Sequence, residues 1–186
     1  MRYKKEELSA LDKIYDAAAT LIKQKEYSKI TCSDIIRESN ISRSTFYMYF
    51  KTKDQIFVHV CNDIFDHIFS KSLSKEKGHD FSSESEEDLI KKITHSFYHF
   101  LEDKDLILAI LNSGASNIFL HQLRKRIKPL IESMINRKLI GHNNIPVEIK
   151  THQYIAGYTS LLQYYLRHGV DIKPETITDY YFIFCK

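Results

Sequence analysis

The stretch TCSDIIRESNISRSTFYMYFKTK, residues 31–53, decides the fold of the chain. It predicts two short helices joined by a tight turn and followed by a basic entry into a third helix. Ile35 and Ile36 give the first helix an apolar side, and Ile41 lies in the turn, where it can pack down between helices. Because helices this short are not stable alone in water, the rest of the chain must hold them in place.

The second short helix, which Ser42 caps and which runs to about Phe50, is polar on its outward side. Its outward residues are Arg43, Ser44, Thr45, Tyr47 and Tyr49. These groups fit phosphates and base edges better than they fit a hydrophobic core, whereas Phe46 and Phe50 are expected to face the core. The pattern is typical of a helix-turn-helix unit that enters a DNA groove.

Charge is distributed unevenly along the 186 residues. Residues 1–55 contain 11 Lys/Arg and 8 Asp/Glu, a difference of +3, whereas residues 56–186 contain 16 of each, a difference of zero. All of the excess positive charge therefore lies in the part of the chain that carries the helix-turn-helix, as expected of a protein that binds nucleic acid.

The composition favours helices over a many-stranded fold, because Gly and Pro number only 5 and 3. The three cysteines are far apart and in no metal-binding spacing, so reduced thiols are expected. The N-terminus is too polar for a signal peptide, and no run of about 18 apolar residues exists. We therefore expect a cytoplasmic protein without a membrane segment.

Apolar spacings of three and four residues predict further helices. These are expected at residues 8–25, 53–73, 89–102, 105–111, 116–138, 147–168 and 174–185. Pro129 should bend or split the helix that contains it, and the Ser-rich, charged residues 72–87 should form a loop. The sequence thus predicts an all-α chain of about nine helices, with a three-helix helix-turn-helix domain at residues 1–52 and a second helical domain at residues 53–186.

Two histidines on one predicted helix, His95 and His99, are four residues apart, a spacing that suits two metal ligands. No third ligand is tied to them in the sequence, so we expect ordinary histidines, no metal and no cofactor. The chain also lacks a Ser-His-Asp order, a nucleotide-binding glycine loop and a zinc pattern. An enzyme is therefore not expected.

Residues 14–53 resemble the N-terminal DNA-binding domain of the TetR family of bacterial transcriptional regulators. The matching features are Ala17-Ala18, Tyr27, Thr31, Ile35, Ile41-Ser42 and the run Thr45, Phe46, Tyr47, Tyr49, Phe50 and Lys53, which falls where the family has thr-leu-tyr-x-tyr-phe-x-x-lys. The family usually has Gly where this chain has Glu26 and Asn40. Glu26 indicates that the first loop needs no positive φ, and Asn40 is the least disruptive replacement for a turn glycine.

Chemistry and resemblance together predict the residues that contact DNA. The set is Thr31, Ser33, Ser42, Arg43, Ser44, Thr45, Tyr47, Tyr49 and Lys53. Arg43, near the start of the second short helix, can read a guanine, and Lys53, at the start of the next helix, can pair with a phosphate. Ser33 stands where the family often has a basic residue, so its contact is expected to be weaker.

The resemblance implies a homodimer that binds a palindromic double-stranded DNA operator and represses transcription until a small molecule binds. The C-terminal domain would bind the effector and dimerise, through the aromatic last two helices. An aromatic cavity could be lined by Phe97, Phe100, Phe119, Tyr154 and Tyr158, although core packing is the better explanation for any one of them. Two alternatives remain open: a DNA-binding protein of the same fold without an inducer, serving chromosome organisation or controlled by a protein partner, and a helical binding protein or enzyme that has lost DNA binding.

Overall fold

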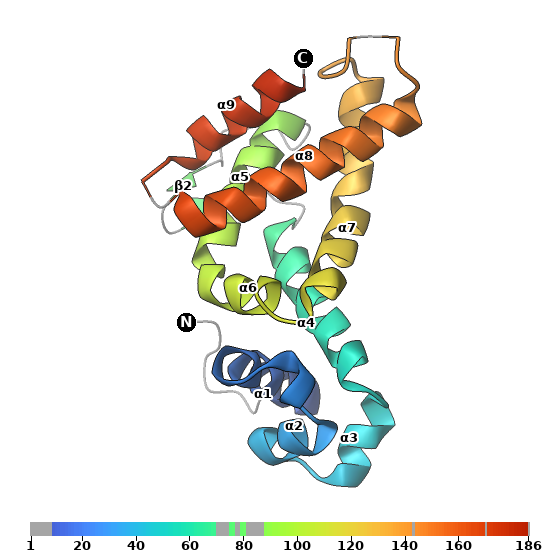
Figure 1. Cartoon of the computed structure of the whole chain (residues 1–186), viewed down its shortest axis with the longest axis vertical. Helices are drawn as coiled ribbons and strands as arrows, with labels where there is room; N and C mark the ends of the chain where they lie inside the picture. Colours follow the sequence, from blue (N-terminus) through green and yellow to red (C-terminus); the bar gives the residue numbers. More distant parts are fainter. Residues whose placement is uncertain are drawn as a thin grey trace. The chain divides into compact units, whose positions relative to one another are not determined.

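The computed structural model describes residues 9–69, 75–76, 79–80, 88–142, 144–169 and 171–185, and it is all-α (Figure 1). Within these residues the helices are α1 Ala10–Gln24, the 3₁₀ helix η1 Tyr27–Lys29, α2 Cys32–Ser39, α3 Arg43–Tyr49, α4 Lys53–Ile68, α5 Leu89–Glu102, α6 Lys104–Leu111, α7 Ser116–Asn136, α8 Val147–His168 and α9 Pro174–Phe184. The prediction of about nine α-helices is confirmed.

Two differences from the predicted elements concern the loop and the proline. Most of the predicted loop at residues 72–87 lies outside the described residues, but its described parts form two short antiparallel strands, β1 Lys75–Glu76 and β2 His79–Asp80. Helix α7 is continuous through Pro129, so the proline does not split it. No single helix in the described ranges is long and apolar enough to cross a membrane; only α6 and α7 counted together meet that requirement.

The chain forms two compact units. The first extends to Asp63 and includes Asp105–Phe119, and the second comprises Ile64–Lys104 and Leu120–Lys186. Helix α4 therefore begins in the first unit and ends in the second. The domain boundary predicted between residues 52 and 53 stays a prediction.

The first unit is built on α1, whose apolar face packs against α2 and α3. Ser9 and Asp12 form a capping box that begins α1. The buried side chains of this unit include Ile14, Ala18, Leu21, Ile30, Ile35, Phe46, Phe50 and Phe57. Burial of these apolar groups is the main force that holds the three short N-terminal helices together.

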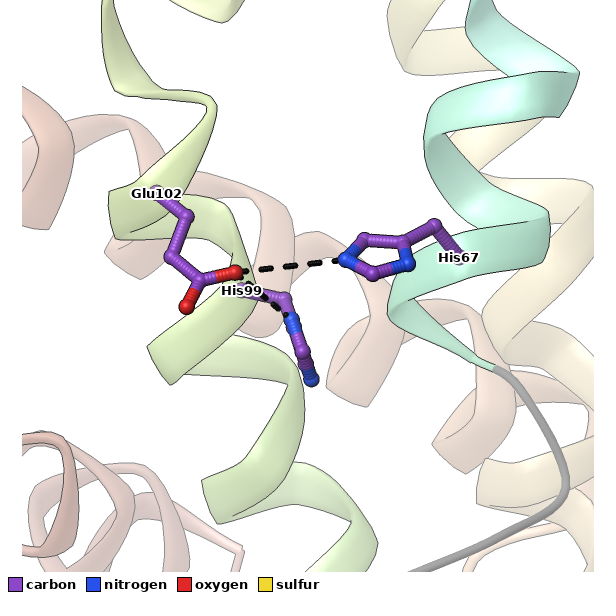
Figure 2. Close-up of side chains that lie close together, drawn as sticks. All are labelled: His67, His99 and Glu102. Atoms are coloured by element: carbon purple, nitrogen blue, oxygen red, sulfur yellow. Dashed lines mark hydrogen bonds and ion pairs between the residues drawn. The ribbon is translucent and has the colours of Figure 1, made fainter. Parts of the chain in front are cut away.

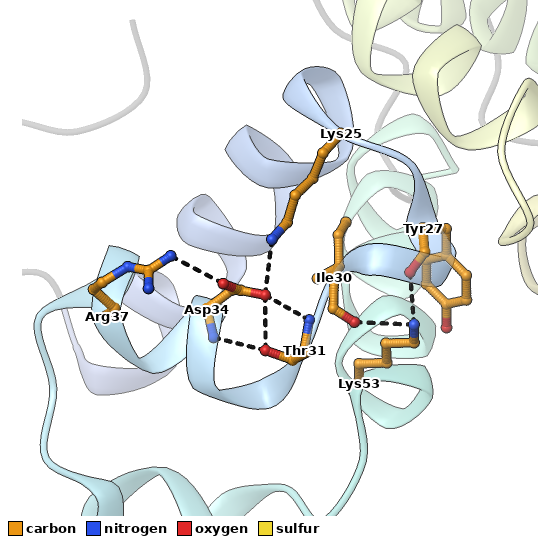
Figure 3. A network of polar contacts seen from close by, with 7 residues as sticks. All are labelled: Lys25, Tyr27, Ile30, Thr31, Asp34, Arg37 and Lys53. Atoms are coloured by element: carbon orange, nitrogen blue, oxygen red, sulfur yellow. Dashed lines mark hydrogen bonds and ion pairs between the residues drawn. The ribbon is translucent and has the colours of Figure 1, made fainter.

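A carboxylate network joins α1 to α2 (Figure 3). Asp34 and Thr31 form a capping box, in which the Thr31 backbone N–H and hydroxyl donate to Asp34 Oδ2 at 2.9 and 2.7 Å. Lys25, at the end of α1, lies 2.8 Å from the same oxygen, and Arg37 donates to Oδ1 at 2.9 Å. These donors, chiefly Lys25 and Thr31, hold the pKa of the Asp34 carboxyl well below its usual range.

The turn between α2 and α3 depends on Asn40, whose φ of 52° is left-handed. Asparagine tolerates this conformation better than other non-glycine residues, as the sequence predicts. Glu26 has a φ of −56°, so the first loop needs no positive φ and no glycine. Both departures from the family pattern are therefore compatible with the local backbone.

The second unit packs α5 against α8 and α9. Tyr158 lies at its centre, where its ring is 5.3 Å from that of Phe97 and its hydroxyl is 2.6 Å from the Ser96 hydroxyl. Gly169 ends α8, and a Cβ there would lie only 2.1 Å from the ring of Tyr165. Close approach of that ring, rather than a positive φ, therefore explains the glycine.

Replacing Asp34 with Asn is expected to lower the free energy of unfolding at neutral pH by about 1–2 kcal/mol, the usual cost of a lost helix cap. Because the folded-state pKa of Asp34 is lowered, its contribution is present above the ordinary carboxyl pKa of about 4 and is lost as the pH falls. The variant should therefore lose less stability than the wild type between neutral pH and about pH 3.

Urea unfolding followed by circular dichroism at the two pH values measures this difference. Glu38→Gln, which alters an exposed carboxylate on the same helix, is the control and should leave stability unchanged. Equal stability of Asp34→Asn and wild type at neutral pH would contradict the role of the network.

Candidate nucleic-acid interface

Helix α3 begins at a hydroxyl cluster. The Ser42 hydroxyl accepts a hydrogen bond from the Thr45 backbone N–H at 3.0 Å, which caps the helix. The same oxygen lies 2.8 Å from the hydroxyls of both Ser44 and Thr45. Three of the predicted DNA-binding residues are thus grouped at the first turn of α3, and the cap fixes the direction in which the helix starts.

One side of α3 is buried and the other is exposed. Phe46 and Phe50 are buried, with the Phe50 ring 6.1 Å from Tyr15 on α1 and 5.4 Å from His59 on α4. The opposite side exposes large groups: Tyr47 is 50% exposed, Met48 75% and Tyr49 47%. Arg43 and Ser44 are exposed as well. A short helix that exposes this much hydroxyl, guanidinium and thioether surface has the composition of a groove-reading helix.

Met48 is a candidate contact that is missing from the set predicted from the sequence. Phe46 and Phe50 are four residues apart and both face the core, so the position midway between them must point outward on a helix of 3.6 residues per turn. The four-residue spacing of Phe46 and Phe50 is the feature of the sequence from which the outward direction of Met48 could have been predicted. An exposed apolar side chain in this place can touch a thymine methyl group.

On α2 the two predicted contacts differ in their surroundings. Ser33 and Thr31 are both exposed, but the Thr31 hydroxyl already donates to Asp34. Thr31 therefore serves first as the cap of α2, and only its remaining lone pair and methyl group are available to DNA. The predicted DNA contacts of both residues stay predictions.

Lys53, at the start of α4, braces the chain internally (Figure 3). Its ammonium donates to the backbone carbonyls of Tyr27 at 2.6 Å and Ile30 at 3.0 Å, and it lies 4.3 Å from the centre of the Tyr27 ring. The Tyr27 hydroxyl in turn donates to Asp54, and burial together with this carboxylate raises the Tyr27 pKa. Two of the three donors of Lys53 are used in this way, so its predicted phosphate contact depends on the third.

The link before α4 is a second set of groups that the sequence prediction leaves out. The side-chain oxygen Oε1 of Gln55 accepts from the backbone N–H groups of Lys51 and Thr52 at 2.8 and 3.3 Å. The backbone N–H of Gln55 donates to the Thr52 hydroxyl. This reciprocal arrangement is a capping box that holds the link rigid. Lys51 is exposed beside α3 in the chain, which makes it a further candidate for a phosphate contact.

Four of the five aromatic residues predicted to line a cavity lie in the second unit, and their role as a cavity lining stays a prediction. Phe97, Phe100 and Tyr158 are fully buried and pack against other rings of the second unit, and Phe119 belongs to the first unit. Tyr154 lines a groove between α8 and α9 of about 540 Å³. Its other lining residues are Gln153, Gly157, Ser160, Leu161, Tyr164, Tyr181, Phe184 and Cys185.

Another hollow in the second unit combines apolar and basic groups. It has a volume of about 380 Å³ and is lined by Ile68, Phe69, Leu89, Lys92, His95, Arg126, Pro129, Leu130 and Ser133. Phe100 does not line the hollow, but its ring packs 6.1 Å from that of the lining residue Phe69. Lys92 and Arg126 give this hollow a positive character, although Arg126 also pairs with Asp66.

The proteins of known family that resemble this chain are transcriptional regulators, as expected from the exposed face of α3. One relative is the protein named "Uncharacterized HTH-type transcriptional regulator YuxN" of Bacillus subtilis (strain 168). It is 26% identical over 175 residues, which cover 89% of this chain and 58% of that protein. The biofilm operon icaADBC HTH-type negative transcriptional regulator IcaR of Staphylococcus aureus (strain Newman) is 24% identical over 123 residues, covering 66% of this chain and 64% of that protein. The chain thus spans less than two thirds of the length of either relative.

The crystal structure of a TetR transcriptional regulator from Streptococcus agalactiae 2603V shares the fold, with a TM-score of 0.75, 23% identity and coverage of 95% of this chain and 93% of that one. The family described as "Bacterial regulatory proteins, tetR family" matches residues 14–60, and "Transcriptional regulator C-terminal region" matches residues 87–186, more than half of the chain. These are families of regulators, not of enzymes. The chain therefore belongs to the TetR family of bacterial regulatory proteins.

Proposed function

We propose that the protein is a ligand-responsive, homodimeric repressor that acts in the cytoplasm on a palindromic operator. The observation that carries this proposal is the exposed face of α3, supported from below by the buried Phe46 and Phe50. One of the relatives, the negative transcriptional regulator IcaR, supports repression as the direction of control. A dimer would present two copies of α3 to half-sites about one helical turn apart.

Each proposed DNA contact has a chemical role. Arg43 would donate two hydrogen bonds to a guanine, a contact that discriminates by about 1–3 kcal/mol. Ser44, Thr45 and the hydroxyls of Tyr47 and Tyr49 would bond phosphates or base edges. Ser42, Thr31, Ser33 and Lys53 complete the proposed set, the last through its remaining donor beside the N-terminus of α4.

The groove between α8 and α9 supports the proposed dimer. Tyr164 and Phe184, which line it, are exposed, and Phe184 is 79% exposed. Gly157 lies in the middle of α8, where glycine costs about 1 kcal/mol relative to alanine. Apart from its chain neighbours and the backbone of α8 itself, a Cβ at this position would meet no atom of the described residues within 4 Å. Packing among the described residues therefore does not require a glycine there, whereas close approach by a helix of a second copy would.

The proposed effector site is the hollow of about 380 Å³. Its apolar walls and the basic side chains of Lys92 and Arg126 suit a molecule with an apolar body and an acidic group. The competing proposal is a regulator without an inducer, and the tight packing of Phe97 and Tyr158 favours it. The two proposals differ in whether any small acid stabilises the protein.

Replacing Arg43 with Ala is expected to relax sequence preference at one operator position, because the guanine loses its two donors. Gel-shift titration against DNA flanking the gene, and against copies with single base changes, measures this. Wild-type discrimination at that position should fall by about 10- to 100-fold. Lys23→Ala, an exposed basic residue of α1, is the control; an Arg43→Ala variant that discriminates as well as wild type would contradict the assignment.

Replacing Gly157 with Leu is expected to give a folded monomer that binds the operator poorly, because the side chain fills the space reserved for a second copy. Sedimentation analysis gives the oligomeric state and circular dichroism the helix content. His152→Leu, an exposed position of α8 outside the groove, should remain dimeric. A Gly157→Leu protein that still dimerises would show that this groove is not the interface.

A screen of apolar carboxylic acids is expected to find one that raises the melting temperature by about 5–10 °C at 100 times its Kd and releases the operator. The Ser133→Leu variant, which fills the hollow from its wall, should bind operator but lose the thermal shift. If no acid stabilises the wild-type protein while operator binding is intact, the regulator without an inducer is the better proposal.

A further inference from the structure

Three potential metal ligands meet in the second unit, at the last turn of α4 and the last turns of α5 (Figure 2). His67 comes from α4, and His99 and Glu102 come from α5; one ligand atom from each lies within 4.8 Å of the other two. We propose that these three residues bind a divalent transition-metal ion, for which zinc is the best-suited candidate. The site is separate from the proposed DNA contacts and does not depend on the proposed function.

The distances suit a tetrahedral ion. His99 Nδ1 lies 3.0 Å and His67 Nε2 lies 3.9 Å from Glu102 Oε2. Neighbouring ligand atoms around zinc, each bound at about 2.1 Å, are about 3.4 Å apart. The two distances to Glu102 bracket that separation, and all three ligand atoms lie within 4.8 Å of one another. Side-chain rotation would have to bring the atoms to about 3.4 Å around an ion.

The helix spacing explains two of the ligands. Residues 99 and 102 are three apart and therefore lie on the same face of α5. His67 reaches them from another helix, with its ring centre 4.7 Å from that of His99. This tertiary neighbour is the third ligand that the spacing of His95 and His99 alone does not reveal.

His95 supplies the outer support that a metal-bound histidine normally has. Its Nε2 lies 3.0 Å from Nε2 of His99, and both rings are buried. Without an ion, His99 must donate from Nδ1 to the Glu102 carboxylate, which only accepts, so its Nε2 accepts from His95. With an ion on Nδ1, His99 carries its proton on Nε2 and donates it to Nε2 of His95, whose own proton then lies on Nδ1. The histidine pair can therefore satisfy its hydrogen bonds in both states.

Burial gives the ion an entry path and leaves room for water. His99 is fully buried, whereas His67 is half-buried and Glu102 is exposed. Two nitrogen ligands and one carboxylate suit zinc and other first-row ions, whereas magnesium and calcium prefer oxygen alone. A water molecule would complete four-coordination.

Isothermal titration of the chelator-treated protein with Zn²⁺ tests the proposal. The expected result is one ion per chain, with no heat from Mg²⁺. His67→Gln and Glu102→Gln, both at positions in contact with solvent, should each weaken binding at least about 10-fold. His121→Gln, an exposed histidine of α7, should bind as the wild type does.

Thermal unfolding in chelator first establishes that each variant is folded. Histidine ¹⁵N chemical shifts then report the site directly: Zn²⁺ should shift Nδ1 of His99 and transfer its proton to Nε2. Absence of Zn²⁺ binding in the wild type, or binding that is unchanged in both ligand variants, would overturn the proposal. If Glu102→Gln binds normally but His67→Gln does not, the three-ligand site is also wrong.

Discussion

The burial of Phe46 and Phe50 is the constraint on which the DNA-binding surface depends. Helix α3 has seven residues, too few to be stable in water by its own hydrogen bonds. Its orientation is therefore set by the two rings beneath it and by the Ser42 cap. The exposed residues of α3 inherit their positions from this packing, and the capping boxes at Thr31 and Thr52 fix the helices on either side.

The sequence predicts the parts of this arrangement that follow from local rules. Apolar periodicity predicts the helices because a helix that is buried on one face has apolar residues three and four positions apart. Asn40 is predicted in the turn because few residues accept its backbone conformation. The contacts of Lys53 show what such local rules cannot predict. Its partners are the backbone carbonyls of Tyr27 and Ile30, more than 20 residues away, and backbone atoms carry no sequence signature.

The same limit applies to the second unit. Periodicity indicates that Phe97, Phe100 and Tyr158 are buried, but it does not indicate whether a buried ring faces another ring or an open volume. The hollow of about 380 Å³ is lined instead by residues from three helices and the residue that follows α4. Its shape, like the meeting of His67 with His99, is a property of tertiary packing that one sequence does not display.

The bracing of Lys53 has a consequence for recognition that concerns entropy. A free lysine side chain loses about 2 kcal/mol of conformational freedom when it is fixed. In this chain the ammonium is already held between two carbonyls and the Tyr27 ring, so that loss is incurred during folding. A phosphate that meets it would find a cation already in position, and association would have one less side chain to order.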